Sequence, residues 1–177
     1  KTDINFFKKI EINNTNFNFI ADSGLILING ISFNFRGIPV INGSIAINQK
    51  DGFLIEGSLV SDIDTNTEKL SELIELFPNL DFLNKKAIVK GNFLNKFKFD
   101  LDNTLKLKDY SYSLEGSLKE SKITLEEEFK SSLLKNGIKE IFFEKSNLKV
   151  DLGSKKESQI FIEGFYKLDK EKKIPKI

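Results

Sequence analysis

The chain has 177 residues, enough for one domain with a sizeable core. Its 27 Lys and Arg residues nearly balance its 26 Asp and Glu residues, and the net charge of +1 excludes a strong general attraction to nucleic acid or to an anionic membrane surface. The absence of Cys and His excludes disulfides, thiolate metal sites and the commonest general base.

The two ends indicate a piece cut from a longer protein. The chain starts at Lys1 without a Met and stops in a charged tail at 169–177. No apolar run reaches the roughly 18 residues that span a bilayer. We therefore expect a single β-rich segment over 1–177 that belongs to a larger protein.

Alternating apolar residues begin near the N-terminus and predict strands. One Asn separates Phe17 from Phe19, and one Asn separates Phe33 from Phe35. This alternation of apolar and polar residues has the period of a strand with one apolar face. The run Leu25–Ile28 is continuously apolar, which is typical of a strand covered on both faces.

The clearest alternation lies in 41–60 and predicts a hairpin with one apolar face. Asp51-Gly52 at its centre is suited to a tight turn. The apolar residues of this segment fall on odd positions, with Ala46 and Leu54 as exceptions: Ile41, Ile45, Ile47, Phe53, Ile55 and Leu59.

Two segments break this period and predict short amphipathic helices. In 66–77 the candidate capping pair Thr65 and Glu68 precedes an apolar helical face, and Pro78 ends the helix. In 126–136 apolar residues at helical spacing end at Asn136-Gly137. We expect both helices to cover part of the sheet or to plug one end of it.

The alternation returns in the second half of the chain. Phe97, Phe99 and Leu101 alternate with charged residues. Further strands are predicted around these alternating apolar residues: Leu105, Leu107, Tyr110, Tyr112, Leu114, Leu118, Ile123, Leu125, Leu148, Val150, Leu152, Ile160 and Ile162. The sequence thus predicts a mostly β fold, an elongated, curved antiparallel sheet of about ten to twelve strands.

A weak repeat of an apolar residue, a polar residue and Gly runs through these strands. Its copies place Gly43, Gly57, Gly91, Gly116 and Gly164 on the apolar face. A missing side chain there permits a bend, a bulge or close approach by another chain or a ligand, although ordinary sheet glycines that ease curvature are the favoured interpretation. Repeated curvature would turn the apolar face into a trough.

No motif in the sequence indicates catalysis, a metal or a cofactor. The acidic residues mostly alternate with Lys on strands, no segment has calcium-loop spacing, and no glycine-rich phosphate loop precedes a helix. Lys and acidic residues balance within the same strands, so phosphate neutralisation is lacking and we expect no nucleic-acid partner. The chain is therefore predicted not to be an enzyme.

The apolar face is the predicted functional surface. Burying one Phe or Ile is worth roughly 1.5–3 kcal/mol, so such a face must be covered. Either the sheet closes on itself, or it binds acyl chains. The candidate lipid-facing residues are Ile45, Ile47, Phe53, Ile55, Phe97, Phe99 and Leu101.

The repeated apolar-polar-Gly units, with Tyr110–Leu118 and Lys122–Leu125 as the strongest stretch, give the chain a family resemblance. Over about residues 25–165 it resembles the AsmA-like family of Gram-negative envelope proteins, the YhdP/TamB type. The resemblance implies a groove-forming sheet in the periplasm, anchored to the inner membrane by parts of the parent chain. It also implies phospholipid transport between membranes and a role in outer-membrane integrity.

The sequence leaves three functional hypotheses. The first is a non-enzymatic, lipid-conducting β-groove whose partners are phospholipid acyl chains. The second is a structural or adhesive β-sandwich module with a closed apolar core. The third is an accessory domain of an enzyme, which requires a partner chain.

Overall fold

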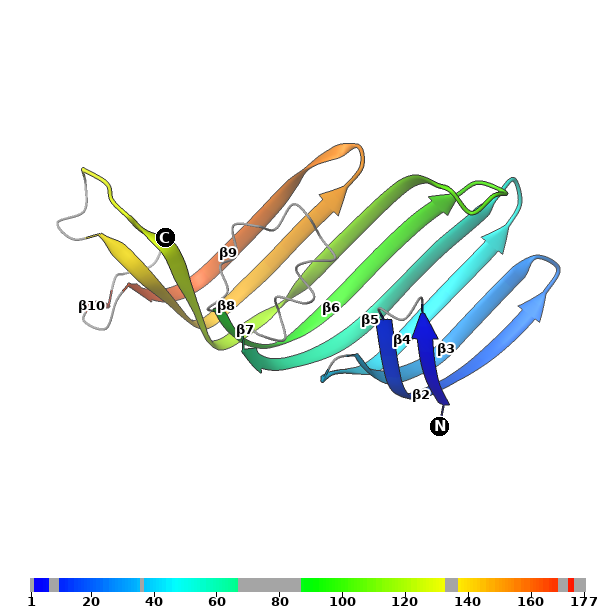
Figure 1. Cartoon of the computed structure of the whole chain (residues 1–177), viewed down its shortest axis with the longest axis horizontal. Helices are drawn as coiled ribbons and strands as arrows, with labels where there is room; N and C mark the ends of the chain where they lie inside the picture. Colours follow the sequence, from blue (N-terminus) through cyan, green and yellow to red (C-terminus); the bar gives the residue numbers. More distant parts are fainter. Residues whose placement is uncertain are drawn as a thin grey trace. The chain divides into compact units, whose positions relative to one another are not determined.

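A computed structural model describes residues 2–6, 10–35, 37–66, 87–132, 137–168 and 172–173 of the chain. These residues form one antiparallel sheet in which every strand lies beside the next strand in sequence, in the order β1 to β10 (Figure 1). The strands are β1 (Thr2–Phe6), β2 (Ile10–Asp22), β3 (Leu25–Phe35), β4 (Ile38–Gln49), β5 (Phe53–Asn66), β6 (Ala87–Leu101), β7 (Leu107–Phe129), β8 (Ile138–Gly153), β9 (Lys156–Leu168) and β10 (Lys172–Lys173).

The prediction of a mostly β, antiparallel fold is confirmed. The sheet has ten strands, of which β10 has two residues, so the count lies at or slightly below the expected ten to twelve. Short turns join β2 to β3, β4 to β5 and β8 to β9, as hairpin connections allow.

The chain divides into two compact units. Unit 1 contains 1–62, 92–116 and 148–161, and unit 2 contains 63–91, 117–147 and 162–177. Strands β5 to β9 contribute residues to both units. All seven predicted lipid-facing residues belong to unit 1.

The described residues contain no helix, and so none that could cross a membrane. The helix predicted over 66–77 lies outside the described residues except for Asn66, which ends β5. The helix predicted over 126–136 is wrong at its start, because β7 continues to Phe129. Alternation through Ile123 and Leu125 and pairing with β8 keep the chain extended there, whereas 133–136 are outside the described residues.

The predicted hairpin at 41–60 is confirmed as β4 and β5. Gln49 pairs with Phe53 across a three-residue loop in which Gly52 has a φ of 133°. Ile47 pairs with Ile55, and Ile45 with Gly57, so these odd residues share one face.

Ile41 is an exception to this shared face. The register shifts between Val40↔Ser61 and Asn42↔Val60, which leaves Ile41 in a bulge where it is exposed. Its placement in the odd-numbered apolar set was wrong because an extra residue reverses the alternation.

Each unit has a small buried core. Ile31, Ile38 and Val40 are buried in unit 1, and Phe93 is 1% exposed. In unit 2 the buried apolar residues are Leu118 and Phe143. The best-packed part of unit 1 is thus separate in sequence from the residues predicted to face lipid.

Candidate functional site

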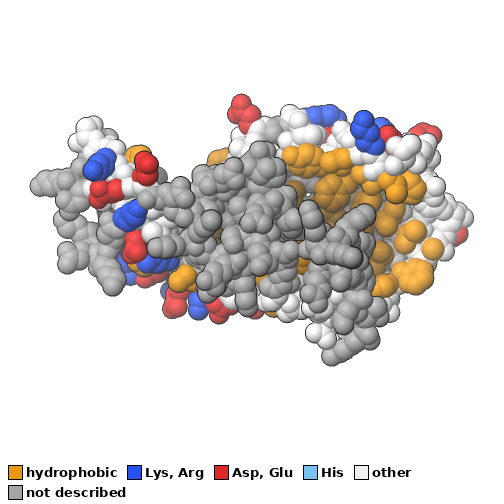
Figure 2. All heavy atoms as spheres, viewed as in Figure 1, with side chains coloured by type: hydrophobic (Ala, Val, Ile, Leu, Met, Phe, Trp, Pro, Cys, Tyr) orange, Lys and Arg blue, Asp and Glu red, His pale blue; other side chains and the backbone are white. Residues whose placement is uncertain are grey.

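The apolar face of unit 1 is built from paired rows of side chains. Ile47 of β4 pairs with Ile26 of β3 on one side and with Ile55 of β5 on the other. Ile45 pairs in the same way with Ile28. Directly paired residues of antiparallel strands point to the same face, so these rows are continuous across three strands. Figure 2 shows hydrophobic side chains gathered on this side of the sheet.

All seven predicted lipid-facing residues belong to this apolar face. They lie on the neighbouring strands β4, β5 and β6, and each is half-buried. The rings of Phe97 and Phe99 are in tilted contact, with centroids 5.5 Å apart. Ile26 and Ile28 extend the rows onto β3, although the continuously apolar run Leu25–Ile28 concealed which of its residues share this face.

The glycines of the repeat do not leave open space on this face. A Cβ atom at Gly57 would lie 2.5 Å from Cζ of Phe97, because the Phe97 ring fills that position. At Gly43 the space is occupied by Leu59 and Ile31. At Gly43 and Gly57 the space in front of the glycine is therefore filled by side chains of the protein itself.

A polar junction made by Asn95 and Tyr112 joins β5, β6 and β7 at one end of the apolar rows. The Asn95 amide nitrogen donates to the Leu59 carbonyl at 3.1 Å and to Ser61 Oγ at 3.0 Å. The Tyr112 hydroxyl donates to Asn95 Oδ1 at 2.7 Å. Burial raises the pKa of Tyr112 to about 12. Tyr112 thus serves as a hydrogen-bond donor here, besides being part of the predicted apolar alternation.

The opposite, polar face of unit 1 carries two hollows. One of about 710 Å³ lies over β6 to β9 and is lined by residues such as Lys96, Lys98 and Ser113. The other, of about 360 Å³, lies over β3 to β6 and is lined by residues such as Ser44 and Ser58, and it shares Lys96 with the first. Neither hollow was predicted, because sequence alternation identifies which side chains share a face but not how deeply that face is indented.

Several charged side chains of this polar face form ion pairs. Lys98 contacts Glu56 at 2.8 Å, and Lys149 contacts Asp151 at 3.5 Å. Exposed pairs of this kind contribute little to stability. They do leave the hollows without a strong net field, so the polar face is typical of the solvated side of an antiparallel sheet.

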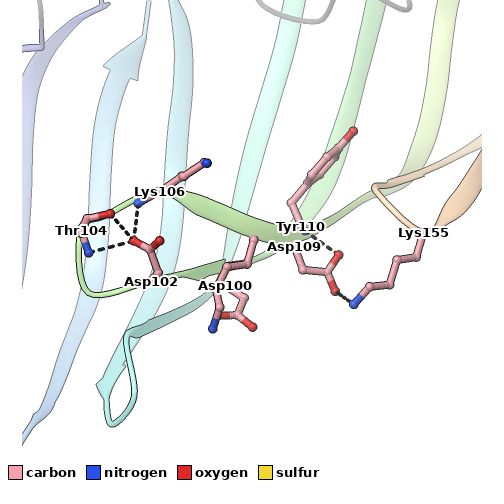
Figure 3. Close-up of polar contacts among 8 residues, drawn as sticks. Asp100, Asp102, Thr104, Lys106, Asp109, Tyr110 and Lys155 are labelled. Carbon is pink, nitrogen blue, oxygen red and sulfur yellow. Dashed lines mark hydrogen bonds and ion pairs between the residues drawn. The ribbon is translucent and has the colours of Figure 1, made fainter.

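Two aspartates hold the loops at one end of unit 1 (Figure 3). Asp102 accepts hydrogen bonds from the Thr104 hydroxyl and the Lys106 amide, which hold the pKa of its carboxyl below the ordinary value. Asp109 of β7 binds Lys155 at 2.6 Å and also Ser154, and these contacts likewise lower its pKa. Both carboxylates thus hold loop residues in place through hydrogen bonds.

The described part of the chain has no cluster of side chains suited to metal binding. Within it, no three acidic side chains are grouped so that they could hold a metal ion. The sequence contains no His or Cys to supplement them. The apolar face is therefore the surface with the clearest chemical character.

Comparison with known proteins does not identify the chain. No protein-family model, no curated protein and no solved structure matches it.

Proposed function

We propose that the chain is a non-enzymatic, lipid-binding sheet segment that holds phospholipid acyl chains against its apolar face. The observation that carries the proposal is the set of aligned apolar rows on β3 to β6 in a single sheet. Ile26, at one end of a row, is still 37% exposed. Each methylene of an acyl chain that is buried there would contribute about 0.8 kcal/mol.

The resemblance to the AsmA-like family extends this proposal to a biological setting. In that setting the sheet forms part of an apolar trough in the periplasm, along which phospholipid moves between membranes and maintains the outer membrane. Parts of the parent protein outside this segment would anchor it to the inner membrane. The succession of antiparallel strands that share one apolar face supports this extension.

The polar face fits acyl chains poorly. The hollow of about 710 Å³ is lined mostly by Lys, Ser, Gln and acidic residues, which would have to lose water without gaining hydrogen bonds from a hydrocarbon. Phe97 also lines both hollows, and Leu27 and Ile45 line the smaller one. The closed-sandwich alternative needs a second sheet packed on the apolar rows, and the described residues of the chain contain one sheet. Acyl chains on the apolar face are therefore the better-supported ligand.

The first test measures lipid on the intact protein. The purified chain is extracted with organic solvent and the extract analysed by mass spectrometry, and the delipidated protein is titrated with a fluorescent fatty acid. We expect phospholipid in the extract and saturable binding of the fatty acid. Protein that carries no lipid and does not bind the probe would overturn the proposal.

The second test separates an open lipid-binding face from a closed core. Ile47→Asp places a charge on the apolar face, and Ala46→Asp places one on the opposite face, beside it in β4. We expect Ile47→Asp to keep its circular dichroism spectrum and lose fatty-acid binding, whereas Ala46→Asp keeps both. Unfolding of Ile47→Asp alone would favour a closed apolar core, since an unpaired buried charge is strongly destabilising.

A further inference from the structure

The loop between β6 and β7 is held in one shape by hydrogen bonds to Asp102. Its carboxylate accepts from the Thr104 amide at 2.8 Å and from the Lys106 amide at 3.0 Å, besides the Thr104 hydroxyl (Figure 3). The Leu105 amide donates to the Asp102 carbonyl at 3.0 Å, and the Asp102 amide donates to the Lys106 carbonyl at 2.9 Å. The backbone on both sides of Leu105 is therefore fixed.

Leu105 occupies a position of this loop that favours glycine. Its φ is 64°, in the left-handed region that bulky side chains avoid. In hairpin loops where a turn beginning at Asp ends in a left-handed residue, Gly is the usual residue at that point. The geometry of the turn therefore does not explain why a leucine stands here.

Hydration disfavours this leucine as well. The Leu105 side chain is 63% exposed, and the Leu107 side chain is 49% exposed. A leucine that is both conformationally strained and exposed to water breaks two local rules at once, and such exceptions concentrate at functional sites. We therefore looked for a partner that would bury both leucines.

The charges of the loop fit a phospholipid surface. Residues 103–108 contain two lysines, which alternate with the leucines, and no acidic residue. The acidic residues just before them are engaged, because Asp102 binds the loop and Asp100 Oδ1 lies 3.6 Å from Lys108 Nζ. At the boundary of a bilayer, leucines are buried among acyl chains while lysines beside them reach the phosphates.

A protein partner fits this loop less well. A stable protein interface buries about 800 Å² of each partner, and two leucines at the end of a hairpin supply only a fraction of that area. A bilayer needs no complementary pocket, and binding strength there depends on the apolar area that is inserted and on attraction to anionic lipids.

We propose that the β6–β7 loop docks on a phospholipid bilayer, with Leu105 and Leu107 among the acyl chains and Lys106 at the phosphates. The loop directly follows Leu101, one of the residues of the apolar face. Docking would therefore bring a bilayer beside the surface proposed to hold acyl chains. The docking loop goes beyond the proposed function, since it uses residues outside the apolar rows.

The test is flotation of the 177-residue chain with vesicles of phosphatidylcholine and phosphatidylglycerol. We expect the unchanged protein to float with them. Leu105→Asp should lower the partition coefficient about tenfold or more, because it removes an inserted leucine and adds a charge of the same sign as the phosphates. Ile41→Asp is the control, because Ile41 is similarly exposed, at 56%, but lies in the bulge of β4.

Leu105→Gly separates a role in docking from a role in folding. Glycine adopts the left-handed φ without strain, so the thermal midpoint should stay the same or rise, whereas flotation should weaken. A lower thermal midpoint would show that Leu105 serves the fold, and unchanged flotation would show that its side chain does not enter the bilayer. Either result overturns the proposal.

Failure of the docking proposal is distinguishable from failure of the proposed function. Leu105→Asp should still bind the fluorescent fatty acid, and Ile47→Asp should still float with vesicles. Unchanged protein that does not float overturns docking, whatever its fatty-acid binding. Flotation that Leu105→Asp and Ile41→Asp reduce equally, or that Ile47→Asp abolishes in a folded protein, overturns it too, because another surface would then hold the bilayer.

Discussion

The ring of Phe97 lies over the backbone of Gly57, so closely that a Cβ atom at residue 57 would stand 2.5 Å from Cζ of Phe97. The two residues belong to β5 and β6, the strands that also carry Ile55 and Phe99 of the apolar face. This contact links the glycine repeat to packing of the sheet.

Gly57→Ala should therefore destabilise the protein. The added methyl group forces the Phe97 ring or the β5 backbone to move, which typically costs about 1–3 kcal/mol in the free energy of unfolding. Urea denaturation followed by circular dichroism measures it. Gly153→Ala is the control, because its Cβ would come no nearer than 3.3 Å to another atom, the Tyr110 carbonyl oxygen, and a much smaller loss is expected.

A double variant tests the cause of this effect. Phe97→Ala removes the ring that occupies the position, so Gly57→Ala should cost little when it is added to Phe97→Ala. Full additivity of the two changes would show that the strain at residue 57 does not come from Phe97.

The junction at Asn95 should contribute to stability through its hydrogen bonds. Tyr112→Phe removes the donor to Asn95 Oδ1, for an expected loss of about 0.5–1.5 kcal/mol. Asn95→Ala also removes the donor to the Leu59 carbonyl and to Ser61, and should cost about 1–3 kcal/mol. Equal stability of both variants and the unchanged protein in urea would contradict this role.

The same tyrosine predicts sensitivity to alkali. Burial raises the pKa of Tyr112 from 10.0 to about 12, so the neutral phenol is favoured in the folded state. Its contribution to stability is fully present below pH 10 and is lost as the pH rises toward 12. The thermal midpoint should fall less steeply over this range in Tyr112→Phe, and phenolate absorbance should show one fewer late-titrating tyrosine in that variant.

Asp109 predicts sensitivity to acid. Its hydrogen bond with Lys155, and to a lesser extent that with Ser154, lowers its pKa from the ordinary 3.8. The contribution of the Asp109 carboxylate to stability is therefore present above pH 3.8 and is lost as the pH falls through the lowered pKa. Asp109→Asn should have a lower thermal midpoint than the unchanged protein at pH 7, and the difference should shrink in acid. A difference that stays constant with pH would show that the carboxylate charge is not involved.

The sequence predicted much of the local structure where alternation is regular. The hairpin of β4 and β5 and the shared face of Phe97 and Phe99 follow from a period of two. The alternation failed at Ile41, because a bulge inserts one residue and the sequence pattern has no sign of it. The prediction failed again at 126–129, where apolar residues at helical spacing suggested a helix, because these residues belong to β7 and lie in the sheet beside β8.

The finer features of the candidate site depend on contacts between strands. The alternation of apolar and polar residues in the sequence does not predict these contacts. The glycines were correctly placed on the apolar face at Gly43 and Gly57, yet only the packed structure shows that Leu59 and Phe97 fill the space in front of them. Tyr112 was grouped with apolar residues because its neighbours alternate, and its hydroxyl partner Asn95 is 17 residues away in sequence.

The bulge at Ile41 and the unbroken pairing of β3 with β4 restrict how this sequence can vary in length. Ile28 pairs with Ile45 and Phe33 pairs with Val40 in one unbroken register, and the bulge at Ile41 of β4 lies between these two pairs. A one-residue deletion in β3 alone would set its apolar residues against the polar residues of β4 on one side of the deletion. Viable insertions and deletions in this region should therefore occur in matched pairs on neighbouring strands.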